Sequence, residues 1–287
     1  MNSPIDAAAA GQITLGGELT VNRLGFGAMR ITGPGVWGDP PDISSAVRLL
    51  RRAVHLGVNF IDTADAYGPE VSENLLARAL YPYPSDLVIA TKGGLVRPGP
   101  GEWNRDARPA HLRAACEASL KRLRLGRIDL YQLHAPDPAV PLEESIGELV
   151  RLRAEGKIRH IGVSNVTVAE LQRCERLTAV VSVQNRYNLD DRTAEKVLAH
   201  CTARGIAFLP WAPIASGRHA TSAGATGALA RFAQRIGIST AQAALAWLLH
   251  HAPVMLPIPG TASMTHLEEN IAAASVSMTA EDLRAIS

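Results

Sequence analysis

A carboxylate and a phenol stand close together in the segment NFIDTADAYG, residues 59–68. Asp62 ends a short apolar run that reads as a strand, and Tyr67 follows five residues later in a turn. Carboxylates and phenols are among the side chains that transfer protons in enzymes. Lys92 ends a second apolar run, LVIATK, where a buried ammonium is costly unless it has a partner. Charged residues at the ends of buried runs are candidates for a functional site.

The same placement recurs in later parts of the chain. Short runs rich in valine and isoleucine alternate with helical patterns of about ten to fifteen residues. We expect strands at residues 24–27, 58–62, 87–92, 128–134, 158–164, 180–185, 206–211 and 254–258, and helices that include 43–56, 109–123, 142–154, 193–204 and 241–250. Most runs end in a polar or hydrogen-bonding side chain, namely Asp62, Lys92, His134, Ser164 with Asn165, Gln184 with Asn185, and Trp211.

This alternation predicts an α/β fold, a single (β/α)8 TIM barrel over residues 11–287. A short β-hairpin around Gly16-Gly17 precedes the barrel, and residues 1–10 are expected to form a frayed tail. Because the carboxyl ends of all barrel strands share one rim, the polar strand ends should converge there. A doubly wound nucleotide-binding sheet is the alternative, but the segment GFGAMR at residues 25–30 lacks the third glycine of its fingerprint.

Composition argues against several classes of partner. Lysine and arginine number 29 against 27 acidic residues, a net charge of +2, which is too balanced to attract nucleic acid or an anionic membrane. The three cysteines show neither zinc spacing nor a disulfide framework, so we expect reduced thiols in a cytoplasmic protein. No secretory leader or membrane-spanning run is recognisable. We expect a small-molecule partner, and the choice between monomer and homo-oligomer stays open.

Six segments resemble the aldo-keto reductase family, in order between about Asn22 and about Leu283. They are FIDTADAYG, DLVIATK, IDLYQLH, IRHIGVSN, VVSVQNRYN and IPGTASMTHLEEN. Shorter segments, NRLGFGAM, GPGVWG and ALYPY, are similar to the bacterial pyridoxal reductase-like group of that family. The resemblance implies a barrel enzyme that reduces an aldehyde or ketone to an alcohol with a nicotinamide cofactor. Reduction of pyridoxal to pyridoxine is the first substrate expectation, and it rests on the resemblance alone.

The resemblance places a catalytic tetrad on Asp62, Tyr67, Lys92 and His134. Tyr67 would donate the proton, and Lys92 would lower the pKa of its phenol by favouring the phenolate. Asp62 would keep Lys92 charged and in place, while a neutral His134 would orient and polarise the carbonyl oxygen. The structural alternatives are a helix N-cap for Asp62, a cover over the core for Tyr67 and a hydrogen-bonded core histidine for His134. His134 has no partner at metal-ligand spacing, so we expect no metal.

The same resemblance implies a cofactor site along the rim. Ser164, Asn165 and Gln184 would hold the nicotinamide carboxamide, and Trp211 would stack on the ring unless it is a core tryptophan. Further cofactor contacts are expected at Met29, Pro213, Ile214 and Gly217, and at the adenosine end at Gly260, Thr261, Ser263, His266, Glu269 and Asn270. Many relatives carry a lysine and an arginine at the positions of Gly260 and His266 to bind the 2′-phosphate of NADP. NADPH is the expected cofactor, with Arg218 as a possible helper, and NADH stays open.

Substrate choice and function class leave alternatives. Trp37 and Trp103 lie in loops that follow strand ends, and we expect them to wall an open pocket for an aromatic or small polar aldehyde. One alternative is a cofactor-binding regulatory subunit with negligible turnover, like the potassium-channel β-subunits of the same fold. Another is a metal-dependent barrel hydrolase, which would need clustered histidine and carboxylate ligands.

Overall fold

A curled parallel sheet forms the centre of the computed structural model, which describes residues 5–215 and 227–286. Its seven strands follow the order β3-β4-β5-β8-β9-β10-β11. Adjacent strands are parallel throughout, as expected when a helix or a long loop returns the chain after each strand. The strands are β3 (Phe26–Gly27), β4 (Phe60–Asp62), β5 (Val88–Gly93), β8 (Ile128–Leu133), β9 (Ile158–Ser164), β10 (Val180–Arg186) and β11 (Ala207–Trp211).

The eighth position of the ring is filled by an extended segment, residues 254–259, which we call the seam. Pro257 and Pro259 have no N–H group, so the segment cannot complete a ladder with either neighbour. The predicted (β/α)8 barrel is confirmed, with its last strand reduced to this seam. The backbone hydrogen bonds that close the ring are Phe208 N to Val254 O (2.8 Å), Leu256 N to Phe208 O (2.9 Å), Gly25 N to Pro257 O (2.9 Å) and Gly27 N to Pro259 O (3.3 Å).

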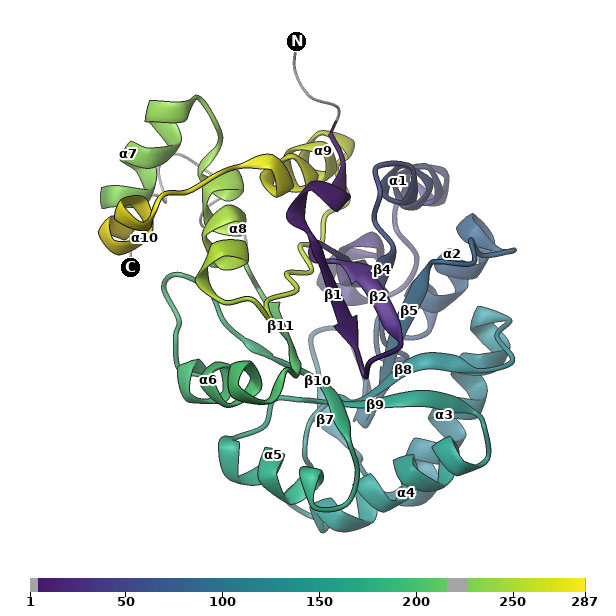
Figure 1. The fold of residues 1–287 in the computed structure, drawn as a ribbon. Helices are drawn as coiled ribbons and strands as arrows, with labels where there is room; N and C mark the ends of the chain where they lie inside the picture. The colour runs from purple at the N-terminus through teal and green to yellow at the C-terminus, as the bar shows by residue number, and fades with distance from the viewer. Residues whose placement is uncertain (1–4, 216–226, 287) are drawn as a thin grey trace.

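Helices surround the ring of strands (Figure 1). Side-chain caps fix several of their starts: Asp42 accepts a hydrogen bond from Ser45 N, and Thr167 opens a capping box with Glu170. The helices that the sequence predicted are confirmed to within two residues at each end. The helices are α1 (Ile43–His55), α2 (Val71–Leu80), α3 (Pro109–Leu123), α4 (Leu142–Ala154), α5 (Val168–Glu175), α6 (Glu195–Arg204), α7 (Gly227–Ile236), α8 (Thr240–His251), α9 (Met264–Ala272) and α10 (Ala280–Ile286).

The predicted hairpin consists of β1 (Gln12–Leu15) and β2 (Leu19–Asn22), which pair antiparallel and lie across one end of the ring (Figure 1). Its apolar residues Leu15, Leu19 and Val21 pack with side chains from the amino-terminal parts of the strands, such as Phe60 and Val88. The hairpin therefore covers the amino-terminal end of the barrel. The opposite end carries the loops that follow the strands.

One local expectation needs correction, and one predicted loop contains additional structure. Residues 1–10 were expected to fray, but Ala7–Ala10 form a short 3-10 helix. Asp6 caps this turn by accepting from Ala8 N, and Ala7, which is fully buried, donates its N–H to Leu56 O at 2.8 Å. The loop after β5 also contains a small antiparallel pair, β6 (Leu95–Val96) with β7 (Asn104–Arg105). Within residues 5–215 and 227–286, no helix combines the length and apolar character needed to cross a membrane.

Candidate active site

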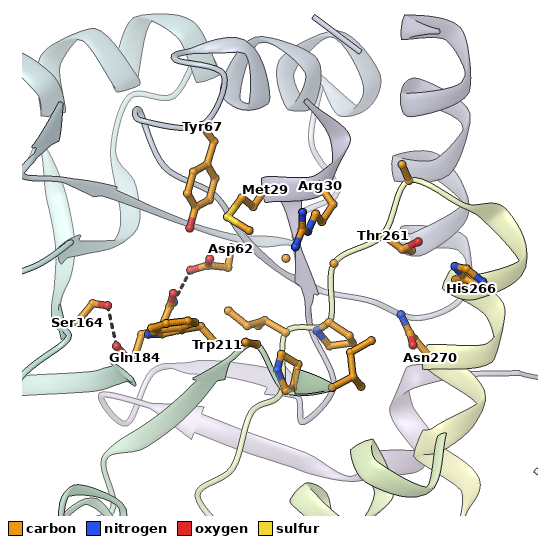
Figure 2. A pocket seen from close by; sticks show the side chains of 18 of the residues that line it. Met29, Arg30, Asp62, Tyr67, Ser164, Gln184, Trp211, Thr261, His266 and Asn270 are labelled. Carbon is orange, nitrogen blue, oxygen red and sulfur yellow. Dashed lines mark hydrogen bonds between the residues drawn. The ribbon is translucent and has the colours of Figure 1, made fainter. Parts of the chain in front are cut away.

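A cavity of about 810 Å³ opens among the loops at the carboxyl ends of the strands (Figure 2). Asp62, Tyr67 and His134 line one part of it, and the start of α9 lines another, so residues far apart in sequence converge as predicted. The predicted residues that line the cavity are Met29, Asp62, Tyr67, Trp103, His134, Ser164, Asn165, Gln184, Trp211, Pro213, Ile214, Gly260, Thr261, His266, Glu269 and Asn270.

Three predicted residues do not line the cavity. Lys92 is fully buried behind it and reaches the site through its ammonium group. Trp37 lies in the neighbouring loop, with its ring 5.6 Å from the Arg97 guanidinium carbon. Ser263 caps α9, where its hydroxyl accepts from His266 N. Gly217 and Arg218 fall outside the residues that the structure describes.

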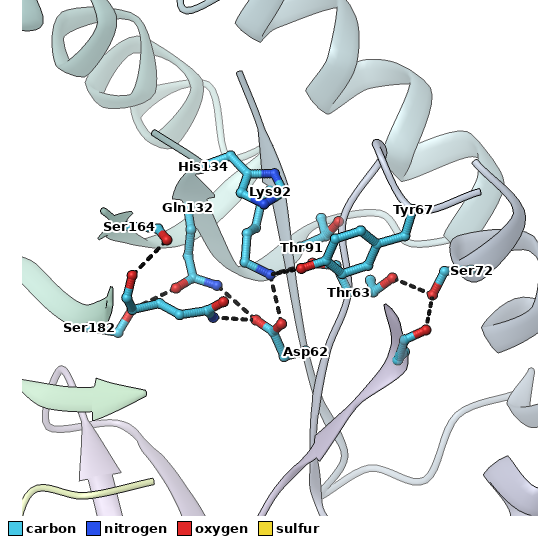
Figure 3. Close-up of polar contacts among 12 residues, drawn as sticks. Asp62, Thr63, Tyr67, Ser72, Thr91, Lys92, Gln132, His134, Ser164 and Ser182 are labelled. Atoms are coloured by element: carbon cyan, nitrogen blue, oxygen red, sulfur yellow. Dashed lines mark hydrogen bonds and ion pairs between the residues drawn. The ribbon is translucent and has the colours of Figure 1, made fainter. Parts of the chain in front are cut away.

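The Lys92 ammonium joins Asp62 to Tyr67 (Figure 3). Its Nζ donates to Asp62 Oδ2 at 2.6 Å, to the backbone oxygen of Thr63 at 2.9 Å and to Tyr67 Oη at 3.4 Å. All three donors of the ammonium are thereby used, which compensates for its removal from water. The strand ends of β4 and β5 hold Asp62 and Lys92, and the loop after β4 carries Tyr67 back over them.

Two glutamines fix the other oxygen of Asp62. Gln132 Nε2 donates to Asp62 Oδ1 at 3.1 Å, and Gln184 Nε2 donates to the same oxygen at 2.8 Å. Gln132 lies on β8, two residues before His134, and was not among the predicted site residues. The Asp62 carboxylate therefore accepts hydrogen bonds on both oxygens and is held in one orientation.

The electrostatics of the site correct one expectation. Burial raises the pKa of the Tyr67 phenol, and the nearby Lys92 ammonium offsets this only in part, whereas the sequence predicted a lowered value. Burial alone would lower the pKa of Lys92, but Asp62 and Tyr67 raise it overall. Burial, with a contribution from Lys92, lowers the pKa of His134 well below its usual range. At neutral pH the site thus holds a phenol, an ammonium and a neutral imidazole.

The His134 imidazole is placed beside the Tyr67 ring. The two rings meet edge to face with their centroids 5.8 Å apart. Nδ1 of His134 is buried and has no hydrogen-bond partner among the described residues. Because Nδ1 has almost no exposed surface, this atom does not itself face the cavity.

Trp211 belongs to the cavity wall, and the core alternative for it is excluded. Its indole is only partly buried, and Nε1 donates to Asn165 Oδ1 at 3.0 Å. Asn165 adopts a left-handed backbone conformation with φ 58° and also donates through Nδ2 to His134 O at 2.9 Å. Ser164 Oγ donates to Gln184 O at 2.6 Å. These bonds tie the ends of β8, β9, β10 and β11 together around one wall.

Close backbone contact explains the glycine at position 260. A Cβ atom there would lie 2.4 Å from Gly27 O, a contact that real side chains do not make. Arg30 occupies the adjoining space, since its Cγ lies 3.6 Å from the same point. Among the described residues that line the cavity, Arg30 is the one arginine or lysine, and its guanidinium has no partner. The site thus carries a free cation that the sequence did not predict.

Comparisons with known proteins agree with this arrangement. A model of the aldo/keto reductase family matches residues 23–287. The chain belongs to the aldo/keto reductase family. An uncharacterized oxidoreductase of Schizosaccharomyces pombe is 50% identical over 280 residues, which cover 98% of this chain and 90% of that protein. Pyridoxine 4-dehydrogenase of Escherichia coli K12 is 38% identical over 274 residues, with 93% and 94% covered.

Solved structures of other reductases share the barrel. A glycerol dehydrogenase from Gluconobacter oxydans matches with a TM-score of 0.88 at 29% identity, over 97% of this chain and 94% of that one. An aldo-keto reductase from Klebsiella pneumoniae in complex with NADPH matches with a TM-score of 0.80 at 28% identity, over 96% and 93%. This aldo/keto reductase is accordingly an oxidoreductase that uses a nicotinamide cofactor.

The cavity fits such a cofactor. Its volume is within the usual range for small-molecule sites. The amino terminus of α9 and the Arg30 guanidinium offer backbone N–H groups and a positive charge for phosphate. Within the described part of the chain, no three histidine, cysteine or acidic side chains are grouped closely enough to hold a metal ion.

Proposed function

We propose that this enzyme reduces an aldehyde or ketone to an alcohol with NADPH, and that Tyr67 donates the proton. The observation that supports this best is the 3.4 Å contact between Tyr67 Oη and Lys92 Nζ beside His134, at the wall of the cavity. A bound reduced nicotinamide supplies the hydride. The other half of the reaction, proton delivery to oxygen, falls to the side chains of the protein.

Each residue of the tetrad has one task in this proposal. Tyr67 is protonated at neutral pH, as an ordinary tyrosine is, and burial raises the pKa of its phenol further. The Lys92 ammonium stabilises the phenolate that remains after transfer. Asp62 keeps that ammonium charged and fixed. His134 holds the carbonyl oxygen within reach of the phenol and polarises it.

Replacement of Tyr67 by phenylalanine tests the proposal. We expect Tyr67→Phe to lower kcat for an aldehyde at least about 10²-fold, the usual scale for a positioned acid, with the Kd of NADPH unchanged. Tyr81→Phe is the matched control, since Tyr81 is exposed on the surface at 50%. NADPH oxidation followed by absorbance measures both. Full turnover by Tyr67→Phe would assign the proton to another group.

NADPH is proposed over NADH on two observations. A structural relative was solved with NADPH, and the Arg30 side chain adds a cation to the cavity where a lysine at position 260 is sterically excluded. Titration of the protein fluorescence with NADPH and with NADH compares the two affinities. Tighter binding of NADH would refute this choice without affecting the proposed chemistry.

An aromatic aldehyde is the proposed substrate class, with pyridoxal the first to test. Trp103 and Trp211 supply aromatic surface at the cavity, and the related Escherichia coli protein is a pyridoxine 4-dehydrogenase. A panel of aromatic and aliphatic aldehydes, compared by kcat/KM, checks the class. If no carbonyl compound consumes NADPH, the regulatory-subunit alternative replaces the enzyme proposal.

A further inference from the structure

Arg97 binds three loops of the rim together. It lies directly after β6 and is only 8% exposed. The three loops follow β3, β4 and β5, and the second of them carries Tyr67. The guanidinium donates to four backbone oxygens: Glu102 O at 2.6 Å, Val36 O at 2.9 Å, Gly35 O at 3.1 Å and Ala66 O at 3.2 Å.

The same guanidinium sets the position of two tryptophans. Its central carbon lies 3.7 Å from the centroid of the Trp103 ring and 5.6 Å from that of Trp37. Trp103 in turn meets the Tyr67 ring edge to face at 6.3 Å. Arg97 therefore contacts the cavity wall from behind, and a chain of direct contacts leads from it through Trp103 to the proposed proton donor.

Burying an arginine in this space costs free energy, because its charged guanidinium is removed from water. No carboxylate of the described residues pairs with it, so carbonyl dipoles and aromatic faces alone compensate its charge. One of those carbonyls belongs to Val36, a β-branched residue at φ 57°, in a region that such residues rarely occupy. An apolar side chain would fill the volume, but only the planar fork of donors fixes all three loops at once.

We propose that Arg97 is a positioning residue of the reductase, one that sets which aldehydes fit against the cavity wall formed by Trp103 and Tyr67. This inference rests on the proposed function. Because Trp103, which Arg97 holds, contacts the proposed proton donor Tyr67, the loss of Arg97 should alter selectivity between large and small aldehydes while cofactor binding persists. A purely structural arginine would lower stability without changing selectivity.

Arg97→Met tests the proposal, since methionine keeps apolar bulk and removes every donor. We expect kcat/KM for an aromatic aldehyde to fall about 10–100-fold, because misplacement of reacting groups by about 1 Å has effects of this size. For a two- or three-carbon aldehyde the loss should be several-fold smaller. The Kd of NADPH, from fluorescence titration, should stay within about twofold, as expected for a change outside the cofactor contacts.

Arg23 offers a matched control. It also donates to backbone oxygens only, those of Leu249, Ala252 and Met255 at 2.7, 2.9 and 3.3 Å, but at the amino-terminal end of the barrel. Arg23→Met should lower the melting temperature by a similar amount and leave the ratio of kcat/KM between the two aldehydes as in the wild type. The ratio therefore separates positioning from general stability.

Arg97→Lys keeps the charge and loses the planar fork, and it serves if the methionine variant does not fold. We expect the same change in selectivity, at a smaller size. Wild-type selectivity in either folded Arg97 variant would overturn the proposal. If the wild-type protein reduces no aldehyde at all, the proposed function fails instead, so the two failures are distinguishable.

Discussion

The pKa of the Tyr67 phenol shows how burial in the folded protein changes the chemistry expected of a single residue. Its neighbour Lys92 can be read from the sequence as a group that favours the phenolate, but the burial that raises the phenol pKa cannot. The net result is a phenol that keeps its proton at neutral pH but releases it less readily than an ordinary tyrosine does. Lys92 then acts mainly on the product side of the transfer, where it stabilises the new negative charge.

Arg30 carries a prediction at the same scale. Replacing it with glutamine removes the one arginine or lysine that lines the described part of the cavity, so NADPH binding should weaken about 10-fold, as expected for a lost charged hydrogen bond of about 1.5 kcal/mol. Titration at fixed ionic strength measures the change in Kd. An exposed arginine on α2, Arg78, is the control, and Arg78→Gln should bind NADPH as the wild type does.

NADH distinguishes the phosphate that Arg30 contacts. If the guanidinium faces the 2′-phosphate, Arg30→Gln weakens NADPH alone and the preference for NADPH is lost. If it faces the pyrophosphate, both cofactors weaken together. An unchanged Kd for both cofactors would remove Arg30 from the cofactor site.

The position of each residue within its secondary-structure element explains which parts of the site could be predicted. Asp62, Lys92 and His134 were found because a polar residue at the end of a buried strand is rare unless it is used there. Gln132 was missed because it lies inside β8, and only polar residues at the ends of strands were considered as candidates for the site. Arg30 and Arg97 lie in a short 3-10 turn and a loop, and neither periodicity nor spacing reveals which carbonyl or cavity such a side chain meets.

The eighth strand shows a similar limit of local patterns. Residues 254–258 look like a strand by composition, yet the prolines among them leave only scattered hydrogen bonds to either side. For residues 7–10 the predicted frayed tail was wrong, because the alanine-rich sequence has no apolar periodicity and Asp6 nevertheless caps a helical turn there. Closure of the barrel could be predicted from the repeated strand–helix alternation. The pairing of its last segment could not, because it depends on which residues of that segment have a backbone N–H group.

Close packing between β3 and the loop after the seam yields a prediction for Gly260. Alanine at this position would place its Cβ 2.4 Å from Gly27 O, so we expect Gly260→Ala to cost about 1–3 kcal/mol in the free energy of unfolding. Gly147 in α4 is the control because, apart from the adjacent residues and backbone of its own helix, no atom lies within 4 Å of its added Cβ. Gly147→Ala should be neutral or stabilising by up to about 1 kcal/mol. Chemical denaturation compares them, and equal effects would contradict the contact.

At the scale of the whole molecule, one carboxyl group links stability to pH. Oδ1 of Asp65 is buried without a hydrogen-bond partner among the described residues. Burial and the nearby Glu73 raise the pKa of Asp65 from 3.8 to about 8. The folded chain therefore keeps this proton where the unfolded chain loses it, and stability falls as pH rises between these two values.

Asp65→Asn tests this dependence because asparagine cannot ionise. At pH 9 the variant should melt at least about 2 °C above the wild type, and the difference should shrink toward pH 5. Asp86→Asn, at an exposed position, should show no such trend. A constant difference between variant and wild type across this range would mean that Asp65 is ionised in the fold.

Few backbone hydrogen bonds close the barrel at residues 254–259. The cavity spans this junction, with Met29 and Arg30 on one side of it and Thr261 and His266 on the other. A dinucleotide that contacts both sides would crosslink them, so part of its binding free energy would stabilise the junction against local opening. Amide exchange at Gly25, Gly27 and Leu256 should then slow on addition of NADPH far more than exchange within β8 and β9. Uniform slowing of exchange across all strands would mean that the junction opens no more readily than the other strands do.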